Sequence, residues 1–421
     1  MTEPQPLSPG FGGLGIAPGI LTAIDKLGFT TPTPIQQQSI PAALQGKDII
    51  GIAQTGTGKT LAFGIPMMQH LLQAGQGNGL IVVPTRELAL QVDESLRSVG
   101  AVLGFKTAVL IGGASMHIQR QMIQRRPHII VATPGRLLDH MEQRTITLAR
   151  VSVLVLDEAD RMLDMGFQPQ IKRILAAVPT DRQTMLFSAT MPQAIVSIAN
   201  QHMKLPVRVE IAPAGTAADR VVQEVFMMHR EEKTQMLMTV LTEYKGSVLV
   251  FTRTKFGAKK LTTALRSASH SAAEIHSNGS LGQRKEALAG FKSGLYRVLV
   301  ATDIAARGID VTSIELVVNY DLPQNAEDYV HRVGRTGRAG REGHAISFAT
   351  PDQKNDLRDI ERLIRSALPV NRQVTGPSLV PERPRHTQRQ HRPGGRPPHR
   401  GGQSSGHRGG QGGQRRSFGR R

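Results

Sequence analysis

The chain has 421 residues, and its 52 Lys and Arg against 33 Asp and Glu give a formal net charge of +19. A hydrophobic fraction of 39% excludes wholesale disorder and is enough for two or three domains. Cysteine is absent, which excludes disulfides, thiol catalysis and cysteine-ligated metals, and no apolar run is long enough to cross a bilayer. The positive charge indicates a polyanionic partner, nucleic acid before a membrane surface.

The first half of the chain alternates apolar runs with helical stretches. Its start has neither the basic nor the apolar part of a secretory signal, so we expect a cytoplasmic protein. Strands are predicted at residues 48–52, 80–83, 107–111, 128–132, 151–156 and 184–188, and helices at 60–72 and 87–99. Apolar strands separated by helices predict a mostly parallel sheet covered on both faces, an α/β fold.

The second half repeats this pattern, with strands predicted at residues 247–251, 297–301, 314–319 and 344–348. The expected organisation is an N-terminal segment (1–28), a first domain (29–208), a linker (209–220), a second domain (221–370) and a C-terminal tail (371–421). Sheets of this class bind ligands beyond the carboxyl ends of their strands, where the chemical motifs fall.

A phosphate-binding loop follows the first predicted strand. Gly56, Gly58 and Lys59 belong to a pattern that fits a P-loop, although the strict pattern has glycine where this chain has Ala53. Backbone N–H groups of such a loop and the following helix N-terminus converge on phosphate oxygens. The loop comprises Ala53, Gln54, Thr55, Gly56, Thr57, Gly58, Lys59 and Thr60, with Lys59 expected on the β- and γ-phosphates and the Thr60 hydroxyl on Mg²⁺.

A pair of acids ends the strand predicted at residues 151–156. Beside a P-loop, Asp157 is placed to engage Mg²⁺ and Glu158 to orient or deprotonate an attacking water. Asp160 is expected to join motifs through hydrogen bonds. The simpler interpretation, a solvated turn, is disfavoured by the P-loop upstream.

With these motifs the chain resembles the DEAD-box RNA helicases over nearly all of residues 11–350. The family has two RecA-like domains, so the resemblance implies tandem RecA-like domains here. Residues 28–36 are similar to the family's Q motif, with Phe11 as its upstream aromatic residue and Phe29 within it. The amide of Gln36 offers the donor and acceptor that suit the edge of adenine.

The resemblance also implies RNA contacts in the first domain, where side chains, glycine amides and a helix N-terminus bind phosphates. These contacts are Pro84, Thr85, Arg86, Gly112, Gly113, Thr133, Pro134 and Arg136. Ser188 and Thr190 are similar to the motif that couples the two sites. Their hydroxyls are suited to bridging the turn at Asp157–Asp160 or to capping the next helix, and both interpretations stay open.

In the second half the resemblance assigns RNA contacts or their coupling to Arg253, Thr302, Arg307 and Gly308, and the ribose of ATP to Asp310. It assigns the γ-phosphate to Arg335 and Arg338, where an arginine supplied across a cleft stabilises transition-state charge. His331 is expected to link this motif to the acidic turn.

One position departs from the family pattern. Leu281 stands where many members have a glutamine three residues before the arginine that is here Arg284, and Gln283 is a candidate substitute. The departure concerns one backbone contact with RNA. The sequences of the motifs are most similar to those of the bacterial RhlE-type subgroup.

The charge is concentrated at the C-terminus. Residues 372–421 hold 12 Arg and one acid, a net charge of +11, together with 11 Gly and 6 Pro. Such a segment cannot bury enough apolar surface to fold, so we expect it to be disordered. Its RGG-like units predict a sequence-tolerant RNA tether, and the alternative is a solubilising tail without a partner.

These features together predict an RNA-stimulated ATPase that remodels RNA locally. Its expected cofactors are ATP and Mg²⁺, its expected partners are single-stranded and duplex RNA, and its core is expected to be monomeric. Because aromatic residues make up only 4% of the chain, backbone and 2′-OH recognition is expected rather than extensive base stacking. Roles in ribosome assembly, mRNA turnover and cold adaptation are all consistent with this activity. Two alternatives remain: an RNA clamp or annealing protein whose ATPase matters little, and a DNA-directed motor.

Overall fold

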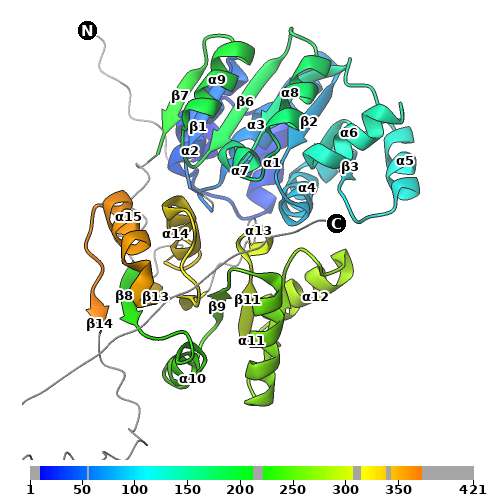
Figure 1. The fold of residues 1–421 in the computed structure, drawn as a ribbon. Helices are drawn as coiled ribbons and strands as arrows, with labels where there is room; N and C mark the ends of the chain where they lie inside the picture. The colour runs from blue at the N-terminus through cyan, green and yellow to red at the C-terminus, as the bar shows by residue number, and fades with distance from the viewer. Residues whose placement is uncertain (1–9, 55, 212–220, 307–313, 338–342, 372–421) are drawn as a thin grey trace, which may run out of the picture. The chain divides into compact units, whose positions relative to one another are not determined.

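The computed structural model describes residues 10–54, 56–211, 221–306, 314–337 and 343–371. Two seven-stranded sheets form within these residues, and all of the paired strands run parallel. Helices connect most successive strands, as Figure 1 shows. The two parallel sheets with covering helices confirm the expected α/β fold.

The first sheet has the strand order β3-β4-β2-β5-β6-β1-β7. Its strands are β1 (Ile49–Ile52), β2 (Asn78–Val82), β3 (Thr107–Leu110), β4 (Ile129–Ala132), β5 (Val151–Leu156), β6 (Gln183–Ser188) and β7 (Val207–Glu210). Its helices are α1 (Pro18–Lys26), α2 (Pro34–Leu44), α3 (Lys59–Ala74), α4 (Arg86–Gly100), α5 (Met116–Gln124), α6 (Pro134–Glu142), α7 (Ala159–Asp164), α8 (Gln168–Ala177) and α9 (Gln193–His202), with short 3-10 helices at Phe11–Leu14 and Ala101–Leu103.

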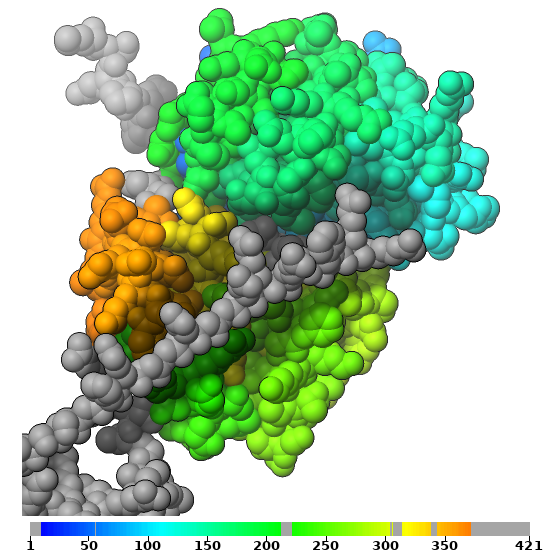
Figure 2. Space-filling view, in the orientation of Figure 1, coloured from blue at the N-terminus to red at the C-terminus, as the bar shows by residue number. Residues whose placement is uncertain are grey.

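Alternate residues along the strands of this sheet enter two separate cores. Val153 and Val155 of β5 pack in the core under α1 to α4, while Leu154 and Leu156 pack in the core under α6 to α9. This is the side-chain alternation of a strand buried on both faces, which explains why β5 reads as a continuous apolar run. The space-filling view shows closely packed side chains over the helices of this domain (Figure 2).

The second sheet has the order β10-β11-β9-β12-β13-β8-β14. Its strands are β8 (Val221–Met227), β9 (Val248–Phe251), β10 (Ala272–Ile275), β11 (Val298–Ala301), β12 (Leu316–Asn319), β13 (Gly343–Ala349) and β14 (Val370–Asn371). Its helices are α10 (Lys233–Glu243), α11 (Lys255–Ser267), α12 (Leu281–Lys292), α13 (Asp303–Ala306), α14 (Ala326–Val333) and α15 (Lys354–Ile364), with a 3-10 helix at Pro351–Gln353. Side chains of α10 and α11 line one core, and those of α12, α14 and α15 line the other.

Every strand expected from the sequence is present, and the described residues contain four further strands that were not predicted. They are β7, β8, β10 and β14, of which β10, β14 and β7 lie at sheet edges. Strand β7 extends to Glu210, so the described part of the expected linker begins inside a strand; residues 212–220 lie outside the described residues. In the part of the chain that is described, no helix is both long and apolar enough to cross a membrane.

The N-terminal segment is part of the first domain's core where it is described. Phe11 is 3% exposed, and Ile20 and Ile24 of α1 are fully buried in the cluster that also contains residues of α2, α3 and α4. The expected segment 1–28 therefore packs with the domain from Phe11 onward. Residues 1–9 and the tail at 372–421 lie outside the described residues.

Candidate functional site

The order of the first sheet separates the predicted motifs into two groups at the carboxyl edge of its strands. Strands β5, β6 and β1 are adjacent, and they carry the acidic turn, the Ser188 motif and the P-loop. Strands β3, β4 and β2 form the other half, and they carry the residues expected to contact RNA. The residues predicted to bind nucleotide and those predicted to bind RNA thus lie at the same edge of the sheet but follow different strands. This edge is the place where such sheets bind ligands.

The P-loop connects β1 to α3 through backbone that favours glycine. Gly56 and Gly58 have φ values of 85° and 89°, in the left-handed region that side chains rarely adopt. Lys59 is 6% exposed, and its Nζ donates a hydrogen bond to the carbonyl oxygen of Ala53, 2.9 Å away. The ammonium group of Lys59 is therefore held at the loop where phosphate is expected to bind. Thr55 lies outside the described residues.

Gln36 is bound to the P-loop itself. Its Nε2 donates to the carbonyl oxygen of Gly58 at 2.9 Å, and its Oε1 accepts from the backbone N–H of Thr33 at 2.9 Å. A Cβ atom on Gly58 would lie 2.6 Å from Gln36 Nε2, so glycine is required for this approach as well as for its φ angle. The sequence predicted only an adenine contact for Gln36; the bond to the P-loop was missed because it joins residues 22 positions apart.

The aromatic residues of the Q motif differ in burial. Phe11 is buried in the first-domain core, whereas Phe29 is 44% exposed. Only Phe29 therefore presents a large apolar surface to solvent. The contact of either residue with adenine stays a prediction.

Asp157 and Glu158 are both buried at the end of β5, 3% and 2% exposed. Burial raises the pKa of Asp157 to about 6, while the ammonium of Lys59 acts in the opposite direction. The Asp157 carboxylate accepts a hydrogen bond from the backbone N–H of Glu158 at 2.9 Å. A buried carboxylate of this kind is stabilised in its charged form by a nearby cation, here Lys59 and, by expectation, Mg²⁺.

Glu158 has features of a functional group rather than of a structural one. Its φ of 51° is unusual for a residue with a side chain, and such strain is concentrated at functional sites. Neither carboxylate oxygen accepts a hydrogen bond from the residues that the structure describes, although Arg161 Nε lies 3.6 Å from Oε2. A buried carboxylate without hydrogen-bond donors is poised to accept a proton from water.

Asp160 joins the acidic turn to the end of β6. Its Oδ2 accepts from the backbone N–H groups of Ala189 and Thr190 at 3.0 and 2.9 Å, and from the Thr190 hydroxyl at 3.0 Å. Its own N–H donates to the Ser188 hydroxyl at 3.2 Å. Of the two interpretations of Ser188 and Thr190, these bonds show the bridge to the acidic turn, and no side-chain cap is formed at Pro192, where α9 begins.

Arg86 and the glycine pair after β3 are in close contact. A Cβ atom on Gly113 would overlap the guanidinium of Arg86, and one on Gly112 would lie 3.4 Å from it. Arg136 reaches the same loop, donating to the carbonyl oxygen of Ala114 at 3.0 Å. The residues predicted to contact RNA on β2, β3 and β4 are thus physically assembled in one place.

The remaining first-domain residues that are predicted to contact RNA lie at the starts of helices. Thr85 caps α4 by accepting from the backbone N–H of Leu88 at 3.2 Å, and Pro84 precedes it in the chain. Thr133 and Pro134 begin α6, with Pro134 in the first turn where proline is favoured.

A buried chain of hydrogen bonds supports this loop and was not predicted. His140 is fully buried; its Nε2 pairs with Gln119 Oε1 at 3.2 Å and its Nδ1 with the Thr145 hydroxyl at 2.7 Å. Gln119 Nε2 donates to the carbonyl oxygen of Ile111, the residue before Gly112, at 3.0 Å. His140 therefore positions the glycine loop from inside the domain. Nothing in the spacing of these residues indicates the contact.

In the second domain the dominant cluster is centred on Arg332, which sequence reasoning did not select. Its Nε and Nη2 bind the two carboxylate oxygens of Asp303 at 2.6 and 2.7 Å, and its Nη1 donates to Asn319 Oδ1 at 3.0 Å. Its guanidinium carbon lies 4.9 Å from the ring centroid of Phe251. This bidentate, stacked arginine fixes α14 to the ends of β9, β11 and β12.

The α14 segment presents the expected second-domain residues from this fixed position. His331 and Arg335 lie on and just after the helix, and Arg335 Nε donates to the carbonyl oxygen of His331 at 3.3 Å. Thr302 follows β11, and Arg253 follows β9 with its backbone N–H bonded to Asp321 Oδ2 at 3.0 Å. Arg307, Gly308, Asp310 and Arg338 lie outside the described residues.

Gln283 has a structural role that competes with the RNA contact for which it is a candidate. Its Oε1 accepts from the backbone N–H of Ser280 at 2.9 Å, and its N–H donates to the Ser280 hydroxyl at 3.2 Å. This reciprocal pair is a capping box at the start of α12. Arg284 Nη1 donates to the carbonyl oxygen of His276 at 3.4 Å.

The donor set next to the P-loop fits Mg²⁺. The hydroxyl of Thr60, at the start of α3, and the buried carboxylate of Asp157 are oxygen ligands of the kind this ion prefers, and Mg²⁺ usually takes few protein ligands and completes its shell with water and phosphate. A glycine loop, its lysine and a strand-end acid pair on a parallel sheet define a P-loop nucleoside triphosphatase.

Two family models match the chain: DEAD/DEAH box helicase over residues 33–198, and Helicase conserved C-terminal domain over residues 232–340. The ATP-dependent RNA helicase DbpA of Bacillus subtilis is 45% identical over 351 residues, covering 83% of this chain and 73% of that protein. The ATP-dependent rRNA helicase rrp3 of Sclerotinia sclerotiorum is 43% identical over 353 residues, with the same two coverages.

Solved structures agree with these relatives. S. cerevisiae Dbp5 bound to RNA and ADP BeF3 superposes with a TM-score of 0.78 at 30% identity, covering 87% of this chain and 96% of that one. Mss116p bound to ssRNA and AMP-PNP gives a TM-score of 0.79 at 28% identity, covering 85% and 77%. The chain belongs to the DEAD-box family of ATP-dependent RNA helicases, which couple ATP hydrolysis to the unwinding or remodelling of RNA.

Proposed function

We propose that the first domain binds MgATP through Lys59 and Thr60, with Glu158 as the residue that orients or deprotonates the attacking water. The observation that carries this assignment is the burial of Glu158, whose carboxylate oxygens accept no hydrogen bond from the described part of the chain. Asp157 would hold Mg²⁺ together with Thr60, and the ion would neutralise charge on the β- and γ-phosphates. Lys59 neutralises the same phosphates from the P-loop.

The arginines that we assign to the γ-phosphate belong to the second domain. Arg332 is committed to Asp303 and Asn319, so it is available for positioning rather than for catalysis. Arg335, just after the end of α14, and Arg338 are the groups we assign to the γ-phosphate, with Asp310 on the ribose and His331 linking to the acidic turn. Hydrolysis therefore requires closure of the two domains, which ATP favours through its contacts with both.

RNA lies, in this proposal, across the loop formed by Arg86, Gly112 and Arg136 and across Arg253 and Thr302 of the second domain. Since RNA and ATP both favour the closed form, each should raise the affinity for the other. Recognition through phosphates and 2′-OH groups distinguishes RNA from DNA without reading its sequence. Unwinding is local and non-processive, because closure acts on the short segment that both domains contact.

The cellular setting is also a proposal. Several relatives are named rRNA helicases, which favours ribosome assembly over mRNA turnover as the source of substrate. We place the protein in the cytoplasm with a monomeric core and in the RhlE-type subgroup. Residues 372–421, with 12 Arg and one acid, would tether RNA through their charge.

An ATPase assay with matched RNA and DNA tests the proposal. Wild-type protein should hydrolyse ATP faster with single-stranded RNA than with DNA of the same length, and Lys59→Ala should abolish turnover. Substantial turnover by Lys59→Ala would refute the P-loop assignment. Equal stimulation by DNA would favour a DNA-directed motor, and RNA binding without stimulation would favour an RNA clamp.

A further inference from the structure

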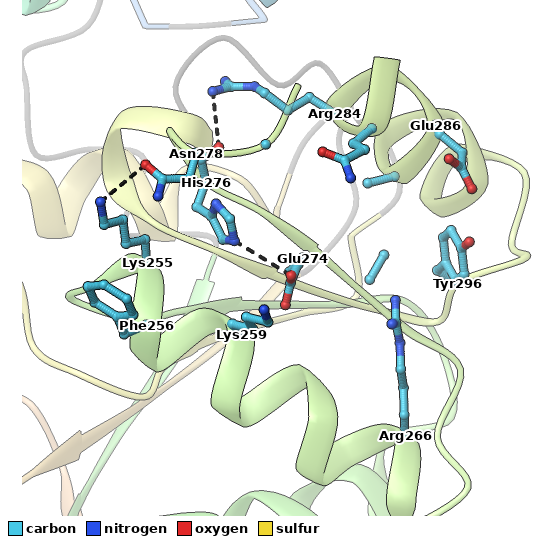
Figure 3. A pocket seen from close by; sticks show the side chains of 14 residues that line it. Lys255, Phe256, Lys259, Arg266, Glu274, His276, Asn278, Arg284, Glu286 and Tyr296 are labelled. Atoms are coloured by element: carbon cyan, nitrogen blue, oxygen red, sulfur yellow. Dashed lines mark hydrogen bonds and ion pairs between the residues drawn. The ribbon is translucent and has the colours of Figure 1, made fainter. Parts of the chain in front are cut away.

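A cavity of about 460 Å³ lies in the second domain on the outer edge of its sheet. Strand β10 is the edge strand there, and the cavity is lined by residues of α11 on one side and of α12 on the other, as Figure 3 shows. Of the second-domain residues considered for RNA contact, Gln283 lines the cavity, whereas Arg253 and Thr302 do not. The cavity therefore extends beyond the RNA contacts expected from the motifs.

Basic side chains predominate in this cavity. Lys255, Lys259 and Arg266 project from α11 toward it, whereas the charge of Arg284, on α12, is paired with Glu87 at 2.8 Å. The acidic lining residues are Glu274 and Glu286. The excess of positive charge favours an anionic ligand, and the chain's known class of ligand, RNA, is a polyanion.

An exposed aromatic ring stands at one end of the cavity. Phe256, in the first turn of α11, is 75% exposed, and Lys255 Nζ lies 5.3 Å from the centroid of its ring. Aromatic residues make up only 4% of this chain, and among the described phenylalanines Phe256 has the largest exposed fraction. A ring beside lysines is the arrangement with which proteins stack a nucleobase while binding its phosphate.

Protection of the sheet edge explains part of this arrangement but not all of it. The lysines belong to α11 and not to β10, but Arg266 Nε donates a hydrogen bond to the carbonyl oxygen of Ala272 in β10 at 2.8 Å. Addition of a peptide strand to β10 is thus disfavoured at that carbonyl. This protection uses a charged side chain and does not require the exposed ring of Phe256.

The inner part of the cavity contains unused polar groups. Within the described residues, neither ring nitrogen of His276 makes a hydrogen bond, although its Nε2 lies 3.6 Å from Glu274 Oε1, and its side chain is 12% exposed. Because both nitrogens are themselves buried, the imidazole must turn toward the cavity before it can donate to or accept from a ligand there. A base edge or a ribose hydroxyl offers both kinds of partner.

We propose that this cavity binds one nucleotide of RNA that flanks the segment held by the helicase motifs. The base stacks on Phe256, Lys259 binds the adjoining phosphate, and His276 contacts the base edge or the ribose. The inference rests on the proposed function, since it concerns the same RNA. It adds a stacking site to a protein whose other RNA contacts are expected to be with the backbone.

RNA affinity measured in the presence of a non-hydrolysable ATP analogue tests the proposal in the full chain. Three RNAs are compared: an oligouridylate just long enough to stimulate the ATPase, the same RNA extended by uridines at either end, and the same RNA extended by abasic nucleotides. Phe256→Ala should weaken binding of the uridine-extended RNA by about fivefold or more, the effect of losing one stacked base. It should leave the other two affinities unchanged, and Phe256→Trp should preserve binding.

Neighbouring lysines on α11 provide a matched control for charge. Lys259 lines the cavity, whereas Lys260 is exposed and does not. Lys259→Gln should weaken binding of both extended RNAs and make it less sensitive to salt, and Lys260→Gln should do so less. Val222→Ala, at an exposed apolar residue of β8, controls for loss of apolar surface.

Stimulation of the ATPase by the short RNA separates this inference from the proposed function. Retained stimulation, with Phe256→Ala affecting only the uridine extension, supports the site. Equal losses for uridine and abasic extensions, or no loss for either, overturn it, and the second result would leave this face to a protein partner. Loss of stimulation by the short RNA would overturn it too, because Phe256 would then belong to the helicase site itself.

Discussion

Gln36 Nε2 donates a hydrogen bond to the carbonyl oxygen of Gly58, 2.9 Å away, in the P-loop residue that precedes Lys59. The same amide accepts from Thr33, so the glutamine joins the Q motif to the phosphate-binding loop. Gln36 is 3% exposed, which leaves its amide little freedom to turn elsewhere. Its contribution to nucleotide binding should therefore act partly through the shape of the P-loop.

Gln36→Leu is expected to weaken binding of both ATP and GTP. Loss of one buried hydrogen bond costs about 1–3 kcal/mol, which corresponds to roughly a fivefold to hundredfold loss of affinity. Titration with fluorescent nucleotides measures it, with Gln37→Leu at the exposed neighbouring position as the control. A loss confined to ATP would show that Gln36 acts on the base alone and that the bond to Gly58 contributes nothing.

Glu158→Gln should slow ATP hydrolysis by roughly a hundredfold or more while ATP still binds, because general base catalysis contributes about that much. The glutamine is similar in size and keeps the side chain in place, yet it cannot take a proton. Single-turnover hydrolysis and nucleotide titration measure the two effects separately. Glu142→Gln, at a half-exposed ion pair with Arg173, is the control. Hydrolysis at the wild-type rate would exclude Glu158 as the base.

The sequence predicts most of this fold because its central strands are buried on both faces. Strand β5 reads Val151–Leu156 without a break, and its bounds are those expected from the apolar run alone. Strands β7 and β14 were not predicted because they are short, with four and two residues, which gives too little pattern to separate a strand from a loop. Strand β10, Ala272–Ile275, was missed because two of its four residues are alanine, which has little preference for strands.

Motif residues could be found from the sequence, but the side chains that hold them could not. The P-loop and the acidic turn have fixed local spacing, because one backbone turn places all of their groups. The bonds from Gln36 to Gly58, from His140 to Gln119 and from Arg332 to Asp303 join positions 21 or more residues apart on different elements. No local pattern encodes such a pair, so only the packed structure reveals it.

His140 should make the first domain sensitive to acid. Its burial, together with the charges of Arg136 and Arg120, lowers the pKa of its imidazole below the ordinary 6.5. Below pH 6.5 the unfolded chain therefore binds a proton that the folded chain resists, and stability falls until the folded pKa is reached. Urea unfolding measured from pH 8 to 5 should show a smaller loss of stability in His140→Gln than in wild type, and the two proteins should diverge as the pH falls below about 6.5.

His202 and His270 also have pKa values lowered by burial, so wild type and variant share a background of acid sensitivity. The quantity to compare is the difference in urea midpoint between the two proteins at each pH. A difference that stays constant with pH would mean that His140 does not titrate in this range. His117→Gln, on the exposed part of α5, is the control for loss of an imidazole.

Removal of residues 372–421 should weaken RNA binding and make it less dependent on salt. These residues follow β14 directly, so every described strand and helix is retained in the shorter chain. They carry 12 Arg against one acid, and each arginine that neutralises a phosphate releases counterions from RNA. The slope of log affinity against log salt concentration, measured by anisotropy, should therefore become shallower, while ATPase activity without RNA is unchanged.

A tail of the same length separates charge from chain length. With its arginines replaced by glutamine, the full-length chain should behave as the truncated one does, because the loss is electrostatic. If the uncharged tail kept wild-type affinity, the segment would act through its glycines or its length, and the interpretation as a charged RNA tether would be wrong. A fall in basal ATPase activity on truncation would show instead that the tail contributes to the two-domain enzyme itself, which would contradict the division of the +19 charge into a tether and a motor.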